Sequence, residues 1–381
     1  DTICLAPAID RTRLGQDTRT TALFAGSIEL LRNIDVWPRC AHLAAPLKAL
    51  RMVDDTGRLL RAPELLFQAS ELGVSAFGHN IANAALIEAL LARSEELPHL
   101  KRLETAGVVE IHPTESCIHL KTHESRQFSG RLVVGADGRK SLCREALGAH
   151  TKEWHHDQVA IATWFAHAFP HQHTSTEFHR RPGPLTTVPL PDNRSSLVWV
   201  ERPDEAKRLM GLNESVFIET LEERLSSFLG RITELAPRAA FPLTVQSVSP
   251  IAANRIALVG EAAHVIPPIG AQGLNLGFRD IAALGDIVMD HRNSGDPGSA
   301  AALSDYRAAR KTDVASRTLA VDLLNRSLIS DMLPASAARG LGLHAMAMFP
   351  ALRRTMMRQG MQPTQNIPRL MRPGATFQRT G

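Results

Sequence analysis

Residues 255–280, RIALVGEAAHVIPPIGAQGLNLGFRD, decide the fold class of this chain. The apolar run 256–259 predicts a buried strand, two prolines stiffen the loop that follows, and glycines mark the start of a helix. Glycine lets backbone N–H groups approach a ligand closely at a helix N-terminus, where the helix dipole favours negative charge. Glu261 adds a carboxylate directly after the strand. We therefore predict an anion-binding edge of an α/β fold.

A second junction between a strand and a helix lies at residues 132–144, LVVGADGRKSLCR. An apolar strand that ends in Gly-Ala-Asp-Gly brings backbone groups and a carboxylate to the carboxyl edge of a parallel sheet, where α/β folds bind ligands. Asp137 has two interpretations at this position. It contacts the ligand, or it caps the following helix, as aspartate commonly does.

Composition excludes several classes of protein. The 381 residues are 44% hydrophobic and carry a formal net charge of +4 with one tyrosine, which predicts a sizeable core and gives nucleic-acid binding little support. The four cysteines lie far apart and predict neither a disulfide framework nor a zinc site. His171-Gln172-His173 lies in a polar loop without metal-ligand spacing, so no metal site is predicted. No apolar run approaches the length of a membrane-spanning helix. We expect a cytoplasmic protein, with any membrane contact peripheral on the inner membrane face.

Periodicity and turn residues divide the chain into four parts. Residues 1–158 predict the first part of a dinucleotide-binding domain, with a β-hairpin insertion at about 47–75. Short β-like stretches over 159–248 predict a β-rich second domain. Residues 249–298 return to strand, loop and helix, and 299–381 are helical. The dinucleotide-binding domain is therefore expected to be interrupted by the β-rich domain.

Within the first part, three elements are predicted. Thr2–Ala6 has the pattern of a short buried strand, and the apolar residues of 20–34 have helical spacing. A helix is also expected over 83–94, with Asn83 as its cap.

The two junctions resemble the internal Asp-Gly motif and the later Gly-Asp motif of class A flavoprotein monooxygenases, and more closely those of the ubiquinone-biosynthesis hydroxylases. Further matches extend the resemblance over nearly the whole chain: residues 17–23 DTRTTAL with Val36-Trp37, residues 183–185 GPL with 196–199 SLVW, and residues 241–243 FPL. The resemblance implies an interrupted, Rossmann-like FAD-binding α/β domain of the glutathione-reductase type, a β-sheet-rich substrate domain and C-terminal helices.

The resemblance also implies site residues. The cofactor-binding residues would be Arg19, Asn83, Asp137, Gly260, Glu261, Gly270, Ala271, Gln272, Gly273, Leu274 and Asn275. Pro267, Pro268 and Gly270 would frame the flavin face where O2 reacts, and no side chain need act as a nucleophile. Asn83 stands where the group commonly has Gln, and Glu261 stands where it has Asp. His264 follows the strand, where a packed structural role is expected rather than that of a base.

The implied activity is hydroxylation of an aromatic ring, with NAD(P)H reducing FAD and O2 supplying the oxygen atom. The expected substrate is a polyprenylated phenol, and the expected partners include an assembly for ubiquinone biosynthesis. Two alternatives stay open: a monooxygenase for a small soluble aromatic acid, and a non-catalytic scaffold subunit of such an assembly.

The front and the end of the chain add two expectations. No GxGxxG motif occurs, and Thr2–Pro7 resembles the second strand of the unit that carries it, so the chain is expected to begin roughly 30 residues late. Near the other end, residues 341–361 combine methionine, leucine and phenylalanine with three arginines. This segment is expected either to meet a membrane or partner subunit, or to be an ordinary helix packed on the flavin domain.

Overall fold

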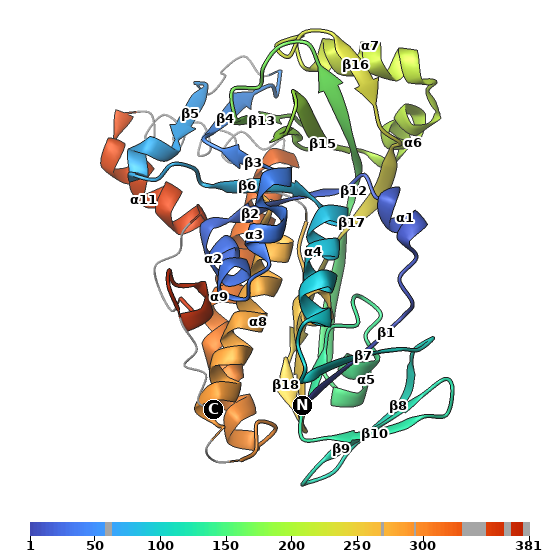
Figure 1. The fold of residues 1–381 in the computed structure, drawn as a ribbon. Coiled ribbons are helices and arrows are strands. Elements are labelled where there is room, and N and C mark those ends of the chain that lie inside the picture. The colour runs from blue at the N-terminus through green and yellow to red at the C-terminus, as the bar shows by residue number, and fades with distance from the viewer. Residues whose placement is uncertain (58–62, 268–269, 293–294, 330–347, 362–366, 376–381) are drawn as a thin grey trace.

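The computed structural model describes residues 1–57, 63–267, 270–292, 295–329, 348–361 and 367–375. A large sheet with two helices on its outer face forms one end of the molecule, and a helical and parallel-strand region forms the other (Figure 1). The strand β12 (His150–His167) spans both regions. This arrangement confirms the expected mixed α/β fold with a sheet-rich part and C-terminal helices.

The large sheet has nine strands, two of which come from the predicted hairpin insertion. Its order is β20 (His264–Val265), β17 (Ala239–Ser249), β12, β15 (Arg194–Glu201), β14 (Leu185–Leu190), β13 (Thr174–His179), β4 (Ala49–Asp54) and β5 (Leu65–Gln68), with β16 (Ile232–Leu235) paired to β12. The hairpin joins the sheet because β4 pairs with β13 in parallel. The helices α6 (Pro203–Gly211) and α7 (Glu214–Arg224) cover the outer face and bury Trp199 and Phe217 between the layers.

The strands of the other region form separate small sheets. β1 (Thr2–Ala6) pairs in parallel with β7 (Leu100–Glu104), and β11 (Val133–Gly135) pairs in parallel with β19 (Ile256–Leu258), beside β18 (Ala252–Ala253). Two further three-stranded sheets are antiparallel: β8 (Val108–Pro113), β9 (Ile118–Thr122) and β10 (Gln127–Gly130), and β2 (Thr20–Phe24), β6 (Gly78–Ala82) and β3 (Ala44–Leu47).

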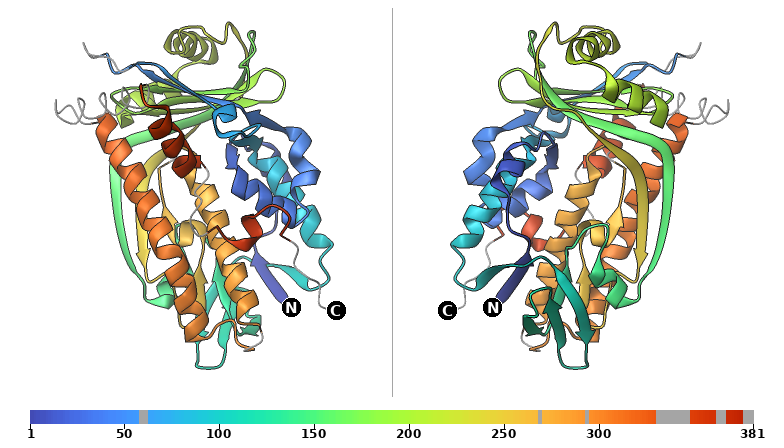
Figure 2. Two further views of the ribbon diagram at one scale, coloured as in Figure 1. Left: turned by 90° about the vertical axis from the view of Figure 1, so that its left-hand side faces the viewer. Right: turned by 90° about the vertical axis from the view of Figure 1, so that its right-hand side faces the viewer.

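Helices pack around these strands. They are α1 (Arg11–Gly15), α2 (Ala25–Asn33), α3 (Trp37–Cys40), α4 (Asn83–Glu95), α5 (Leu142–Leu147), α8 (Gln272–Asp290), α9 (Ala300–Ile329) and α11 (Pro350–Met361), with 3-10 turns at Ala41–Leu43, Ala69–Leu72, Gly260–Ala262 and Arg369–Met371. Figure 2 shows α9 running alongside the long strand β12. Among the described residues, no helix has the length and apolar character needed to cross a bilayer.

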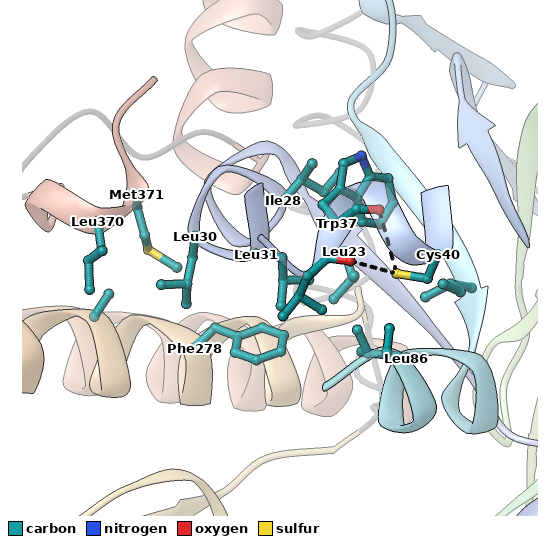
Figure 3. Close-up of a cluster of buried hydrophobic side chains, with 14 residues drawn as sticks. Leu23, Ile28, Leu30, Leu31, Trp37, Cys40, Leu86, Phe278, Leu370 and Met371 are labelled. Atoms are coloured by element: carbon teal, nitrogen blue, oxygen red, sulfur yellow. Dashed lines mark hydrogen bonds between the residues drawn. The ribbon is translucent and has the colours of Figure 1, made fainter. Parts of the chain in front are cut away.

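One apolar cluster ties α2, α3 and α4 to α8 (Figure 3). Leu31 and Leu23 are fully buried, and Phe278 of α8 packs in the same cluster with Met371. Fully burying one such side chain contributes roughly 1.5–3 kcal/mol. This cluster fixes α8 against the segment that begins at β2, which places the N-terminus of α8 beside residues near position 20.

The predicted helix over 20–34 is wrong in its first part. Residues 20–24 form β2, which pairs with β6, and the helix α2 begins only at Ala25. Thr20 and Thr21 are β-branched, which favours an extended backbone. Asn83 also differs from the prediction, because it is the first residue of α4 and Ala82 holds the cap position without a side-chain bond.

Gly78 is a tight point of the β2–β6 ladder, which gives a first prediction. A Cβ atom at Gly78 would lie 2.0 Å from the carbonyl oxygen of Leu23. We expect Gly78→Ala to lower the free energy of unfolding by about 3 kcal/mol in urea denaturation, because the backbone there must shift. Gly211→Ala is the control, since no atom lies within 4 Å of its Cβ, and it should leave stability unchanged or slightly higher. Equal stability of the two variants would contradict this account of β2 and β6.

Candidate functional site

The parallel pair β11 and β19 brings the two predicted junctions together. Gly135 lies opposite Leu258, and the Val259 N–H donates to the Gly135 carbonyl at 3.0 Å. A side chain at position 135 would meet Cys143, since an added Cβ would lie 2.6 Å from its Cβ. Both strands end at the same edge, so the Asp-Gly and Gly-Glu segments leave the sheet side by side. Segments more than a hundred residues apart in sequence therefore meet at one edge.

A cavity of about 470 Å³ lies between this region and the large sheet. One wall consists of Glu261, Pro267 and residues 270–274. The opposite wall is the inner face of the large sheet. Arg19, Thr21 and Asn83 complete the boundary on the side of β2, and Arg139 lies beside Glu261. The predicted residues Arg19, Asn83, Glu261, Pro267 and 270–274 thus line one hollow.

The helix α8 begins at this cavity without a side-chain cap. Its N-cap residue, Ala271, has a left-handed backbone with φ of 53°, a conformation that costs a non-glycine residue free energy and is common at functional sites. No atom lies within 4 Å of a Cβ built on Gly273, whereas one on Gly277 would lie 3.4 Å from the Gly260 Cα. Gly277 therefore permits close packing of α8 on the preceding loop. Gly273 instead faces open space, where uncapped N–H groups and the helix dipole favour an anion.

Asp280 holds the loop before α8 in place. Its Oδ2 accepts from the backbone N–H of Gly260 at 3.0 Å and lies 2.6 Å from Nε2 of His264, while its Oδ1 accepts from Nε of Arg310 at 2.7 Å. Asp280, His264 and Arg310 are all buried. A buried carboxylate requires such partners, and removing one of them is costly. His264 is thus a buried structural residue, as its sequence position predicts.

Asn275 ties the start of α8 to β2 and α2. Its Nδ2 donates to the carbonyls of Ala22 and Ala271 at 2.8 and 2.6 Å, and its Oδ1 accepts from the Phe24 N–H and the Ser27 hydroxyl at 2.9 and 2.7 Å. Asn275 is buried and does not line the cavity. Its amide is fully used within the protein, so the structure gives Asn275 a positioning role beside the predicted site.

Charged side chains at the cavity edge are paired. Arg139 donates to Oε1 of Glu261 at 3.2 and 3.3 Å, which links the Asp-Gly segment to the Gly-Glu segment. Arg19 donates to both oxygens of Asp17, at 2.8 and 2.7 Å. The hydrogen bond from Arg19 lowers the pKa of the Asp17 carboxyl. Asp17 therefore fixes Arg19 at the cavity, a role that the motif around residue 19 did not reveal.

Asn83 is held by a neighbour on β2. The Thr21 hydroxyl donates to Oδ1 of Asn83 at 2.7 Å, and the amide nitrogen of Asn83 takes no part in this bond. Both residues line the cavity. Neither Thr21 nor Arg139 was a predicted site residue. Thr21 lies two residues after Arg19, and in an extended segment residues two apart point to the same side. The sequence could have indicated Thr21 for this reason, but a helix was predicted from residue 20.

Asp137 binds the first turn of α5, although the N-cap residue of that helix is Ser141. Its Oδ1 accepts from the Ser141 hydroxyl at 2.6 Å and its Oδ2 from the Cys143 N–H at 3.1 Å, at the start of α5. Asp137 is not among the cavity-lining residues. Burial, and then the charge of Asp137, raise the pKa of the Cys143 thiol to about 12, so that thiol stays protonated. The capping interpretation describes the observed bonds, and a cofactor contact of Asp137 stays a prediction.

Two other predicted residues lie off the cavity lining. Gly260 is not among the lining residues, and its N–H is bound to Asp280. Pro268 lies outside the described residues. The predicted residues that line the cavity leave room for a cofactor beside α8: Gly273 faces open space, and the helix presents an N-terminus without a side-chain cap, which suits an anionic group such as reduced flavin.

The model of the FAD binding domain family matches residues 9–319. The chain is a member of this family. It is 33% identical over 362 residues to ubiquinone hydroxylase UbiL of Rhodospirillum rubrum, covering 94% of this chain and 83% of that protein. It is 28% identical to 3-demethoxyubiquinol 3-hydroxylase of Escherichia coli, covering 90% of this chain and 86% of that protein. The family expected from the motifs is confirmed, and this FAD binding domain protein is an oxidoreductase of the flavoprotein monooxygenase type.

Solved structures support the same fold. HpxO of Klebsiella pneumoniae, solved in complex with FAD and uric acid, superposes with a TM-score of 0.70 at 15% sequence identity and covers 96% of this chain and 97% of its own. At this level of identity the likeness concerns the fold alone.

The open space at Gly273 gives a second prediction, which concerns the binding of FAD. Gly273→Val should abolish most FAD binding, because its side chain would fill space that no protein atom occupies. The melting temperature of the FAD-free variant should stay close to that of the FAD-free wild type, since no neighbouring protein atom lies within 4 Å of the new Cβ. FAD content is measured by absorbance after purification, and melting by calorimetry. Wild-type FAD content in the variant would remove Gly273 from the cofactor site.

Proposed function

We propose that this chain is an FAD-dependent aromatic-ring hydroxylase that uses NAD(P)H and O2 and acts on a polyprenylated phenol in ubiquinone biosynthesis. The observation that carries the proposal is the cavity itself. A polar wall, formed by Glu261 and the start of α8, faces a largely apolar wall formed by the large sheet, in which serine, threonine and Glu177 side chains are interspersed. The names of relatives such as ubiquinone hydroxylase UbiL support the same substrate class.

The apolar wall suits a lipophilic ring. Ala160, Val188, Val198, Phe241 and Leu243 line the cavity from four strands of the large sheet. Such a surface binds an aromatic ring by removing apolar area from water, and it keeps water away from the reacting atoms.

A small aromatic acid fits the cavity less well. A benzoate would need a cation for its carboxylate, yet within the described lining both arginines are already paired, Arg19 with Asp17 and Arg139 with Glu261. Leaving a buried carboxylate without a partner is costly. A scaffold role is also not favoured, because a chain without a cofactor would have no use for the open space at Gly273 and the uncapped end of α8.

The chain's own groups have distinct tasks in this reaction. FAD, when bound, would supply electron transfer from NAD(P)H and the activation of O2. The N–H groups at the start of α8 would stabilise negative charge at the cofactor. Pro267 and Gly270 would frame the space between cofactor and substrate. The sheet face would orient the ring of the phenol and exclude water.

The proposed activity gives a third prediction. The FAD-loaded chain should oxidise NAD(P)H faster when a short prenylated phenol is added, and mass spectrometry should find one oxygen atom from labelled O2 in the product. Benzoates and hydroxybenzoates should give little stimulation. Hydroxylation of benzoates alone would overturn the substrate, and tight FAD binding without any hydroxylation would favour the scaffold interpretation.

We also infer that α11, together with Met348 and Phe349 directly before it, forms a peripheral membrane contact. Met357 of α11 is buried against Phe67 of β5, so one side of the helix packs on the protein. Other apolar side chains of this segment are exposed: Met348, Phe349, Leu352 and Met356. Arg354 and Arg358 are also exposed. A helix with an apolar stripe beside arginines is suited to lie in the interface of an anionic membrane.

This surface gives a fourth prediction. The double variant Leu352→Ser, Met356→Ser should lose most flotation with phosphatidylglycerol vesicles, because the buried apolar area falls. Val216→Ser is the matched control, since Val216 is an exposed apolar residue on α7, and it should float as the wild type does. Unchanged flotation of the double variant would contradict the membrane contact, as would a wild type that does not float and instead binds a partner subunit through this segment.

A further inference from the structure

A buried carboxylate lies on the apolar wall of the cavity. Glu177 is 8% exposed and lies on β13, in the inner face of the large sheet. Across the sheet it is opposite Met52 on β4 and Thr186 on β14. Glu261 is the other carboxylate of the described lining, but its side chain is 55% exposed and paired with Arg139. Glu177 is therefore the buried acid of this part of the cavity.

A histidine backs this carboxylate. Nε2 of His179 lies 2.8 Å from Oε1 of Glu177, and both residues are buried. They are two positions apart on one strand, so their side chains point to the same face. Glu177 lines the cavity and His179 does not. The bond to His179 uses Oε1 of Glu177, and the described residues supply no hydrogen bond to Oε2.

We propose that Glu177, oriented by His179, accepts the proton of the substrate's phenol hydroxyl group during hydroxylation. The proposal rests on the function proposed above and assigns a catalytic residue to it. A buried charge or polar group is costly unless it is paired. A phenol O–H directed at Oε2 would supply the second hydrogen bond that this carboxylate lacks.

The proton balance of the step is simple. As the ring carbon forms its bond to the incoming oxygen atom, the ring loses electron density and the phenol O–H becomes strongly acidic. That bond breaks, its electron pair moves into the ring, and the proton passes to Oε2 of Glu177. When the ring carbon then loses its hydrogen as a proton to water and the ring regains aromaticity, the proton on Glu177 returns to the ring oxygen. A positioned base of this kind contributes about 10²–10⁴-fold to rate.

The chain offers a matched control pair. Glu153 and His155 on β12 repeat the same spacing, with Nε2 3.3 Å from Oε1, but their side chains are 45% and 68% exposed. Glu153→Gln removes the same charge from a similar pair outside the cavity. It should therefore leave hydroxylation and phenol binding at the wild-type level.

The first test is kinetic. In the FAD-loaded chain, Glu177→Gln should lower kcat for hydroxylation of a prenylated phenol about 100-fold, and His179→Asn should lower it by less. The loss should shrink for a ring-fluorinated phenol, whose hydroxyl is more acidic and needs less help from a base. A merely structural role would lower both substrates equally and would overturn the proposal.

The second test needs no turnover. Without NAD(P)H, the wild type should bind a prenylated phenol at least about fivefold more tightly than its methyl ether, because a hydrogen bond to a charged acceptor is strong. This ratio should fall toward one in Glu177→Ala, measured by calorimetry. An unchanged ratio would overturn the role of Glu177 even if the wild type hydroxylates phenols. A wild type that binds the phenol more tightly than the ether but does not hydroxylate it would contradict the proposed function and leave the hydrogen bond to Glu177 supported.

Discussion

The carboxylate of Asp280 is the constraint on which the site depends. It is buried in α8 and binds a backbone N–H at Gly260, the imidazole of His264 and the guanidinium of Arg310. These bonds connect the strand end, the loop and two helices at one point. Because an unpaired buried charge is costly, each partner must keep its place. The loop of Glu261 and the start of α8 are therefore held at the cavity before any ligand binds, and preorganisation of this kind lowers the cost of binding.

The large sheet forms the cavity wall that faces Glu261 and the start of α8. The long strand β12 extends from the FAD-binding region into the sheet, so the apolar wall and the polar wall belong to one continuous structure. The polar wall suits a charged cofactor and the apolar wall suits a lipophilic ring. Glu177 is the one carboxylate that the described strands of the large sheet place in the cavity lining, among hydroxyl and apolar side chains, and this position motivates the catalytic role proposed for it.

Local sequence predicted the elements with strong local signals. The strand and helix around Gly260 and Gly273 follow from apolar runs, prolines and glycines, whose backbone preferences act within a few residues. The helix expected over 20–34 failed in its first part because a short strand and a helix share the same apolar spacing there. Pairing of β2 with β6 decided the outcome, and that contact joins residues about sixty positions apart.

By itself, the sequence determined the glycine-rich edge at residues 270–273, because glycine acts on the local backbone, and the order of its motifs determined the family and the cofactor class through their resemblance to known flavoproteins. Only the tertiary structure decided which side chains face the cavity. In the tertiary structure Arg139 pairs with Glu261, and Glu177 lies on the cavity wall. Asp137 and Asn275 instead form hydrogen bonds with other residues of the chain. The physical reason is register: alternate residues of a strand face opposite sides, and only long-range pairing fixes which side becomes the site.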